Sequence, residues 1–242
     1  MISSIGQITS SVDSLLKEYS TIAHNLANAS TTGFKRSVNS FIKQAEESNG
    51  ATGTGQIGIK GSIDFAQGSL LRTGRPLDVS ISGKGFFVVE RPDESPIYCR
   101  NGVMHINKAG QLVDLEGRLM AGAEGPIVIP PEVSTAQINI AGDGAVSAGD
   151  MQFGRLKMVD FGEDEGKLAS VGKNCFAATE EDIEPQEAKE MTVRQGFLEN
   201  SNVKLVEELV SLVTVTRQYE TNMKLLSKRA ENNKVMVGVA NS

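Results

Sequence analysis

The hydrophobic positions near the N-terminus recur every three or four residues, which is the period of an amphipathic helix. From Ile5 to Leu26 the spacings alternate between three and four for three heptads, and this gives a narrow apolar seam typical of coiled coils. The pattern predicts a helical segment over residues 1–43, interrupted by polar residues after Leu26. Its seam positions are Ile5, Ile8, Val12, Leu15, Tyr19, Ile22 and Leu26.

A second heptad pattern lies near the C-terminus and predicts a helical segment over residues 195–242. Val206, Val210 and Val213 form another apolar stripe beside the seam, so the first half of this helix has two apolar sides. Two apolar sides predict more than one neighbour. The heptad pattern stops after Ala230. The seam positions are Leu205, Leu209, Leu212, Tyr219, Met223 and Leu226, with Thr216 as a polar break.

Between these segments the hydrophobic period changes to two, which is typical of strands. The stretch "LDVSIS", residues 77–82, alternates strictly between apolar and polar side chains. Asn101-Gly102 is a hairpin signal, and Gly142-Asp143-Gly144 is a second turn signal. Short strands at this spacing predict an all-β domain, sandwich or barrel-like, over residues 66–180.

Together these periods predict an α+β fold with five segments. The helical segment 1–43 leads through a Gly/Ser/Thr-rich linker, residues 44–65, into the β-rich domain 66–180. An acidic connector, residues 181–194, leads to the helical segment 195–242. We expect the two long terminal helices to pair in a coiled-coil-like domain. Each carries a narrow apolar seam that only the other helix or another chain can cover.

Composition and charge exclude several classes of partner. A net charge of −6 argues against a protein that binds the nucleic-acid backbone, which needs a basic face. No apolar run reaches the ~18 residues of a membrane span, so we expect no membrane insertion. The first residues lack the basic and continuously apolar regions of a cleaved secretory signal. An aromatic content of 5% favours a turn-rich β domain over a pocket for a small-molecule substrate.

The sequence offers little for catalysis or cofactor binding. Its two histidines, His24 and His105, cannot build a histidine metal cluster. The Gly-x-Gly-x-x-Gly match at residues 53–58 lacks the strand before it and the helix within it that a dinucleotide site requires. Cys99 and Cys175 are interpreted as two small buried apolar residues, with a disulfide as the alternative. We therefore expect no enzyme activity, no metal and no cofactor.

The segment "IAHNLANASTTGFKRS", residues 22–37, ends the first seam. Asn28 tolerates left-handed backbone geometry, Gly33 accepts a positive φ, and Phe34 supplies an apolar anchor after the break. A plain helix end with a hydrophobic contact explains this composition as well as an assembly motif does. The candidate helix-break motif consists of Asn25, Asn28, Gly33 and Phe34.

Several long segments carry a family likeness. They are "NLANASTTGFK" from residue 25, "GSLLRTGRPLDVSISGKGFFVVE" from 68, "RNGVMHINKAGQLVDLEGRLMAG" from 100, and "QGFLENSNVKLVEELVSLVTVTRQYETNMKLLS" from 195. In this order they resemble the flagellar basal-body rod, hook and axial proteins, and they span most of the chain. Within that family the sequence is most similar to the F-type members of the proximal rod, with the G-type members of the distal rod close behind.

The resemblance implies a structural subunit of the bacterial flagellar rod. Such a subunit would be exported through the flagellar type III apparatus without a cleaved leader. It would then polymerise with other rod proteins and with copies of itself in the basal body, as part of the torque-transmitting drive shaft. The seam positions would be subunit-interface residues. A required disulfide is not expected, because the cysteines would pass the export channel as thiols.

Three alternatives remain open from the sequence. The first is a distal-rod or hook-type axial protein. The second is a coiled-coil trimeric fibre or tail protein, which would form a stable trimer by itself. The third is a β-domain enzyme or ligand-binding module, which would need a concave site with converging polar groups within residues 66–180.

Overall fold

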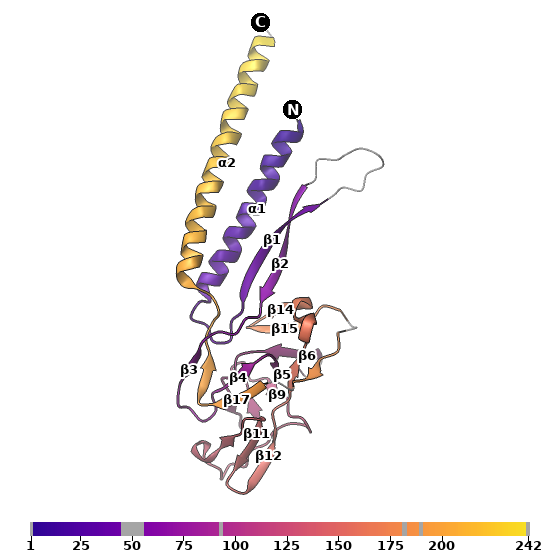
Figure 1. The fold of residues 1–242 in the computed structure, drawn as a ribbon, viewed down its shortest axis with the longest axis vertical. Coiled ribbons are helices and arrows are strands. Elements are labelled where there is room, and N and C mark those ends of the chain that lie inside the picture. Colours follow the sequence, from indigo (N-terminus) through magenta and orange to yellow (C-terminus); the bar gives the residue numbers. More distant parts are fainter. Residues whose placement is uncertain (1, 45–55, 92–93, 181–182, 189–190, 241–242) are drawn as a thin grey trace. The chain divides into compact units, whose positions relative to one another are not determined.

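The chain is an α+β protein with a helix near each end and a β-rich region between them (Figure 1). The computed structural model describes residues 2–44, 56–91, 94–180, 183–188 and 191–240. The chain divides into two compact units. We call residues 1–27, 37–62 and 204–242 the helical unit, and residues 28–36 and 63–203 the β-rich unit.

The helical unit contains two helices and one pair of strands. Its elements are α1 (Ile2–Ala27), β1 (Arg36–Gln44), β2 (Gln56–Asp64) and α2 (Leu205–Ala240). The two helices pack on each other, and β1 pairs with β2. Figure 1 shows the strand pair beside α1, where Asn39 of β1 donates hydrogen bonds from Nδ2 to Glu18 Oε2 at 2.8 Å and Thr21 Oγ1 at 2.9 Å. A lone pair of strands is marginally stable, so packing on a helix gives it support.

The predicted helical segment 1–43 is wrong beyond Ala27. The chain turns after α1 and continues as β1, because Ser37 and Asn39 satisfy polar side chains of α1 instead of extending the helix. The predicted linker 44–65 contains β2, and its residues 45–55 lie outside the described residues. The C-terminal helix begins at Leu205 and not at 195, and it continues past Ala230 to Ala240.

The β-rich unit contains many short strands in four sheets. A seven-strand path runs in the order β14-β15-β6-β5-β9-β8-β7, and β13 joins it by pairing with β5 and β16. The other sheets are β10-β11-β12, β17-β4 and β18-β3. The bounds are β3 (Leu70–Arg72), β4 (Val79–Gly83), β5 (Phe86–Arg91), β6 (Glu94–Cys99), β7 (His105–Ile106), β8 (Leu112–Val113), β9 (Leu119–Met120), β10 (Asn139–Ile140), β11 (Ala145–Ala148), β12 (Met151–Arg155), β13 (Met158–Asp160), β14 (Leu168–Gly172), β15 (Cys175–Ala178), β16 (Gln186–Glu187), β17 (Met191–Gln195) and β18 (Phe197–Glu199), with 3-10 turns at Thr135–Gln137 and Gly162–Lys167.

Strand β5 separates two hydrophobic clusters of the β-rich unit. Phe87 and Val89 belong to the larger cluster, whereas Phe86 and Val88 belong to the smaller, aromatic one. Successive side chains of a strand point to opposite faces, so both faces of β5 are buried. This explains why its sequence is a continuous apolar run and does not alternate.

One of the two predicted turns is a hairpin and the other is not. Residues 142–144 connect β10 to β11, which pair antiparallel as expected. Asn101-Gly102 follows β6, whose partners are β5 and β15, so the predicted hairpin is wrong. Gly102 instead packs against β4, where its carbonyl accepts the Val79 N–H at 2.9 Å. A Cβ at Gly102 would overlap the Val79 carbonyl oxygen, so the glycine serves a close backbone approach.

Candidate assembly site

The two helices of the helical unit share a small apolar cluster. Leu15 and Ile22 of α1 are buried against Val215 of α2. Leu26, Leu212 and Tyr219 pack partly buried around them. Five predicted seam positions therefore meet within one chain: Leu15, Ile22, Leu26, Leu212 and Tyr219.

The face of α2 that lies against α1 keeps the predicted positions Leu212 and Tyr219 but differs from the predicted seam at the positions around them. Val215 is buried there, whereas the predicted position Thr216 is exposed. Glu208 is likewise buried and accepts a hydrogen bond from Asn25 Nδ2 at 3.4 Å, whereas the predicted position Leu209 is exposed. Neighbouring residues of a helix project about 100° apart, so these exchanges rotate the covered face by part of that angle. The sequence did not predict Val215 at this contact, because the apolar residues of α2 fit more than one heptad register.

This displacement leaves an apolar stripe of α2 uncovered within the described chain. We call it the outer stripe, and it consists of Leu205, Val206, Leu209, Val210 and Val213. Between 47% and 73% of each of these side chains is exposed. Met223 of α2 is also exposed, as are Leu16 and Tyr19 of α1. An exposed apolar surface of this kind is typical of interaction sites.

The remaining seam positions have mixed environments. Val12 is buried, and Ile8 and Leu226 are half-buried. Ile5 lies in α1, outside the residues whose side chains the structure describes.

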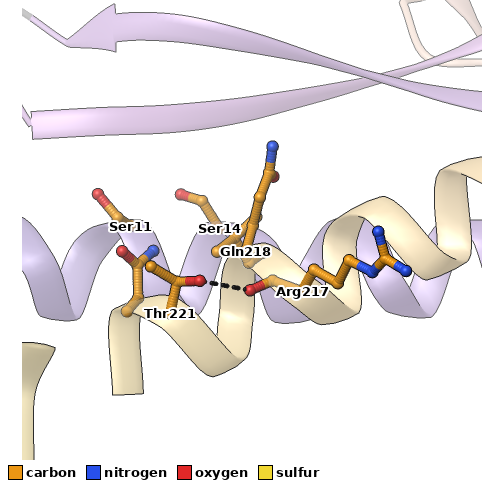
Figure 2. A pocket seen from close by; sticks show the side chains of 7 residues that line it. Ser11, Ser14, Arg217, Gln218 and Thr221 are labelled. Carbon is orange, nitrogen blue, oxygen red and sulfur yellow. Dashed lines mark hydrogen bonds between the residues drawn. The ribbon is translucent and has the colours of Figure 1, made fainter. Parts of the chain in front are cut away.

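An open groove of about 440 Å³ lies between the two helices (Figure 2). Its lining residues are Ser11, Ser14, Leu15, Arg217, Gln218, Thr221 and Asn222. The Thr221 hydroxyl donates to the Arg217 carbonyl at 2.8 Å, so it is satisfied by its own helix (Figure 2). Arg217 is the one charged group on this lining, which gives the groove no paired acid and base for catalysis.

Asn25, the first residue of the helix-break motif, ties α1 to the start of β1. It is 1% exposed, and its side-chain oxygen accepts the Ser37 N–H at 2.9 Å. Its Nδ2 donates to the Ser37 carbonyl oxygen, also at 2.9 Å. One amide side chain thus satisfies both peptide groups of one residue, as a neighbouring strand would. This geometry gives Asn25 a structural role within the helical unit.

The other motif residues, Asn28, Gly33 and Phe34, belong to the β-rich unit. The Asn28 carbonyl accepts the Thr31 N–H at 3.0 Å, and its side-chain oxygen accepts the Thr31 hydroxyl at 3.2 Å. Gly33 has φ +69° and donates its N–H to the Glu199 carbonyl at 2.7 Å. Phe34 is buried. The turn is therefore held by specific contacts with distant parts of the chain as well as by local propensity.

Gly33→Ala is expected to destabilise the β-rich unit more than Gly74→Ala. Both glycines have similar positive φ values, +69° and +73°, so alanine costs about 1–2 kcal/mol of backbone strain at each. A Cβ at Gly33 would also lie 2.5 Å from the Asn101 backbone nitrogen, whereas nothing lies within 4 Å at Gly74. This overlap should cost a further ~1–3 kcal/mol. Calorimetric melting of both variants tests it, and equal melting temperatures would contradict the close packing of Gly33.

The residue after the motif, Lys35, belongs to a buried ionic cluster. Its ammonium lies 2.7 Å from Glu199 Oε1 and also donates to the carbonyls of Ala66 and Phe65, at 2.8 and 3.2 Å. Glu199 Oε2 lies 3.4 Å from Arg100 Nη1. The side chains of Lys35 and Glu199 are fully buried, and that of Arg100 is 2% exposed. One carboxylate thus serves two buried cations.

Burial changes the acidity of both cations in this cluster. It lowers the pKa of the Lys35 ammonium, and the charge of Glu199 partly opposes that shift. Burial likewise lowers the pKa of Arg100, again opposed by Glu199. The Arg100 guanidinium also lies 5.2 Å from the centre of the Phe86 ring, a cation–π distance. The sequence signal for this cluster was the presence of charged residues at the ends of apolar strands, in "YCRNG" and "GFLEN".

Two further properties of the described residues bear on function. Neither helix contains an apolar stretch long enough to cross a membrane. In the same part of the chain, His, Cys, Asp and Glu side chains do not gather in groups of three or more that could hold a metal ion.

Two family models match this chain. Residues 80–148 match the D1 domain of the flagellar hook protein FlgE/F/G, and residues 194–237 match the C-terminal region of the flagellar basal-body rod FlgEFG proteins. The first match lies in the β-rich unit. The second contains all of the outer stripe.

Full-length relatives are similar along most of the chain. The flagellar basal-body rod protein FlgG of Buchnera aphidicola subsp. Acyrthosiphon pisum is 34% identical over 237 residues, which cover 85% of this chain and 87% of the relative. FlgF of Salmonella typhimurium is also 34% identical, over 233 residues and 90% of each chain. FlgF of Caulobacter vibrioides is 33% identical over 225 residues, which cover 90% of this chain and 89% of the relative.

Proposed function

We propose, because this chain belongs to the flagellar basal-body rod protein family, that it is a structural subunit of the rod that polymerises through its terminal helices. Its neighbours would be other rod proteins and copies of itself. The observation that carries this proposal is the outer stripe of α2, which stays exposed although α1 and α2 already pack together.

The apolar area of the outer stripe suits an assembly contact. The stripe consists of five large aliphatic side chains, each about half exposed or more. They lie on the first three turns of α2. Covering one such side chain contributes about 1.5–3 kcal/mol. A partner helix with a similar stripe would cover them by coiled-coil packing, with α1–α2 contacts inside each subunit and outer-stripe contacts between subunits. Tyr19, Leu16 and Met223 would extend that surface.

A shaft that transmits torque requires subunits that resist deformation. Within the helical unit, Asn25 holds Ser37 at the start of β1, and within the β-rich unit the Lys35–Glu199–Arg100 cluster joins three segments that are distant in sequence. These contacts support a role in transmitting torque, because they oppose movement along the chain with hydrogen bonds as well as apolar packing.

The proposal includes no enzymatic step. The helix–helix groove lacks a paired acid and base, and the family is named for a structure and not for a reaction. It also includes delivery through the flagellar type III export apparatus without a cleaved leader, as the family resemblance implies.

The F-type proximal position is the assignment that we propose within the rod, and the distal rod is the alternative. Relatives of both types reach 34% identity, so sequence similarity alone does not separate them. In a strain that lacks this protein, basal-body assembly should stop before the proximal rod is complete. Electron microscopy of purified basal bodies would show where the structure ends. Complete proximal rods in the deletion strain would favour the distal position.

Rod subunits and trimeric fibres differ in their behaviour as isolated proteins. We expect the purified chain to be monomeric at micromolar concentration, because its outer stripe must meet a neighbour in the geometry of the rod. Light scattering coupled to size exclusion measures the mass directly. A stable trimer of the lone chain would support the fibre alternative instead.

A further inference from the structure

The two cysteines of the chain, Cys99 and Cys175, lie directly opposite each other on neighbouring strands. Cys99 ends β6, Cys175 begins β15, and the two are paired residues in the antiparallel register. Directly opposed residues of such strands have Cα atoms about 4.5–5.5 Å apart. Disulfides span Cα separations of about 4.4–6.8 Å. The strand register therefore places both thiols where a covalent bond can form without backbone movement.

One of the two sulfur atoms has a cationic partner. Arg118 donates from Nη2 to Cys175 Sγ at 3.2 Å. The same guanidinium is held by Asp114, whose Oδ2 accepts from Nε at 2.7 Å and from Nη2 at 2.6 Å. A bidentate contact of this kind fixes the position of the guanidinium. The Cys99 sulfur lies 3.5 Å from the Asn101 carbonyl oxygen, which is one acceptor available to its thiol proton.

The two thiols consequently differ in acidity. A hydrogen bond from Cys99, together with the charge of Arg118 and its hydrogen bond, lowers the pKa of Cys175 to about 7, although burial opposes this shift. The hydrogen bond with Cys175, followed by burial, raises the pKa of Cys99 well above its usual range. A low-pKa thiol beside a high-pKa thiol is the arrangement of an attacking and a resolving cysteine.

We propose that Cys99 and Cys175 form a reversible thiol–disulfide site, in which Cys175 is the attacking thiol, Cys99 the resolving thiol, and a disulfide compound the oxidant. This goes beyond the rod function, because it concerns a covalent modification of the β-rich unit that assembly does not require. The closed form would join β15 to β6 and link residues 99 and 175 across the fold.

The reaction balances as two exchange steps. The Cys175 thiolate attacks one sulfur of the oxidant RSSR, forms a Cys175–S–S–R bond, and releases RS⁻, which takes a proton. Cys99 then loses its proton, and its thiolate attacks the Cys175 sulfur and releases the second RS⁻. The net change is two protein thiols and one RSSR giving one protein disulfide and two RSH, so the two electrons reside on the oxidant.

The position of β15 gives the oxidant a route to buried thiols. Cys99 and Cys175 are 3% and 1% exposed, so the folded strands shield both. Only β14 lies beyond β15 in the described strand order, and the β14–β15 turn contains Lys173 and Asn174 at positive φ values of 53° and 56°. Two consecutive positive φ values are typical of a type I′ turn, so β14 and β15 form a two-residue hairpin at the end of this strand order. Opening of this terminal hairpin would expose Cys175 first.

The test begins with oxidation of the reduced full-length protein by glutathione disulfide, from about pH 6 to about pH 9. We expect the intact mass to fall by two hydrogen atoms, with a Cys99–Cys175 link in the peptide map and full reversal by dithiothreitol. The oxidised protein should melt roughly 5–10 °C higher than the reduced protein, because the link constrains the unfolded chain.

Single variants assign the two roles. Cys99→Ser should accumulate one glutathione adduct on Cys175, whereas Cys175→Ser should leave Cys99 at least about tenfold slower to react. Arg118→Gln should move the midpoint of Cys175 alkylation by iodoacetamide to higher pH. A purely structural role of Arg118 would leave that midpoint unchanged.

Three outcomes would overturn the proposal. They are two persistent thiols in folded protein under conditions that oxidise the denatured chain, a disulfide between two molecules, and equal reactivity of the two cysteines. Oxidation of the wild-type protein tests disulfide formation without any variant, so the misfolding of a substituted protein would not change that result.

Discussion

Leu209→Asp is expected to abolish swimming motility while leaving the β-rich unit folded. Leu209 is 47% exposed in the outer stripe, so an aspartate there meets water in the isolated chain and costs little stability. In the polymer the same position would be covered by a neighbour. The carboxylate would then lose its hydration without a partner, a cost of several kcal/mol that every subunit in the rod would repeat.

The measurement is a complementation assay in a strain that lacks the protein, scored by soft-agar swimming. Circular dichroism and thermal melting of the purified variant report whether the fold is retained. Swimming at the wild-type rate would contradict the assignment of the outer stripe as a subunit contact.

Gln218→Asp is the matched control for that substitution. Gln218 is an exposed residue on the same helix, and the substitution adds the same charge. It projects about 180° round the helix from Leu209 and about 80° or more from every member of the outer stripe. Motile cells carrying Gln218→Asp would exclude a general effect of negative charge on α2. Leu26→Asp is a less specific probe, because Leu26 packs partly buried against the α1–α2 cluster and the change would also disturb that contact.

Glu199→Gln is expected to lower the stability of the β-rich unit by about 3–5 kcal/mol. The neutral side chain keeps the shape of glutamate but leaves the Lys35 and Arg100 cations buried without their carboxylate. Uncompensated buried charge is strongly destabilising, and its cost is larger than the net contribution of the intact ion pair. The midpoint of thermal unfolding should fall by roughly 10 °C, which scanning calorimetry measures.

Glu207→Gln provides the matched control. Glu207 lies 3.0 Å from Lys204 in an ion pair whose two side chains are 68% and 74% exposed. Water screens such a pair, so the change should alter stability by less than about 1 kcal/mol. If both variants melted together with the wild type, the Lys35–Glu199–Arg100 cluster would not stabilise the fold.

The sequence predicted the presence of the two helices correctly, but it did not predict where they begin and end. The heptads of Ile5 to Leu26 and Leu205 to Leu226 located α1 and α2, because a period near 3.6 is a local property of the chain. The strand β1 was missed because its formation depends on hydrogen bonds from Ser37 and Asn39 to side chains of α1. These residues are not neighbours in the sequence. The Asn101-Gly102 hairpin was wrong for a related reason, since the glycine there serves a close approach to β4.

Five of the predicted seam positions meet in the α1–α2 contact within the chain, and their role between subunits stays a prediction. Val215 and Glu208 were missed because the apolar pattern of α2 fits more than one orientation of the helix face. Charged residues at the ends of apolar strands did not by themselves indicate that Lys35 and Arg100 would share one carboxylate. From the sequence alone, charged residues are predicted to be exposed to solvent, and only the fold shows that these are buried together.

The amino-acid sequence by itself determined the α+β class, the terminal helices and the membership of a rod protein family, since hydrophobic period and motif order are carried by neighbouring residues. Only the tertiary structure decided which helix face is already covered, which stripe remains for a partner, and which buried charges and thiols face each other. Those properties depend on contacts between residues far apart along the chain, such as Asn25 with Glu208 and Cys99 with Cys175, and the free energy of such contacts is set by the packing of the whole fold.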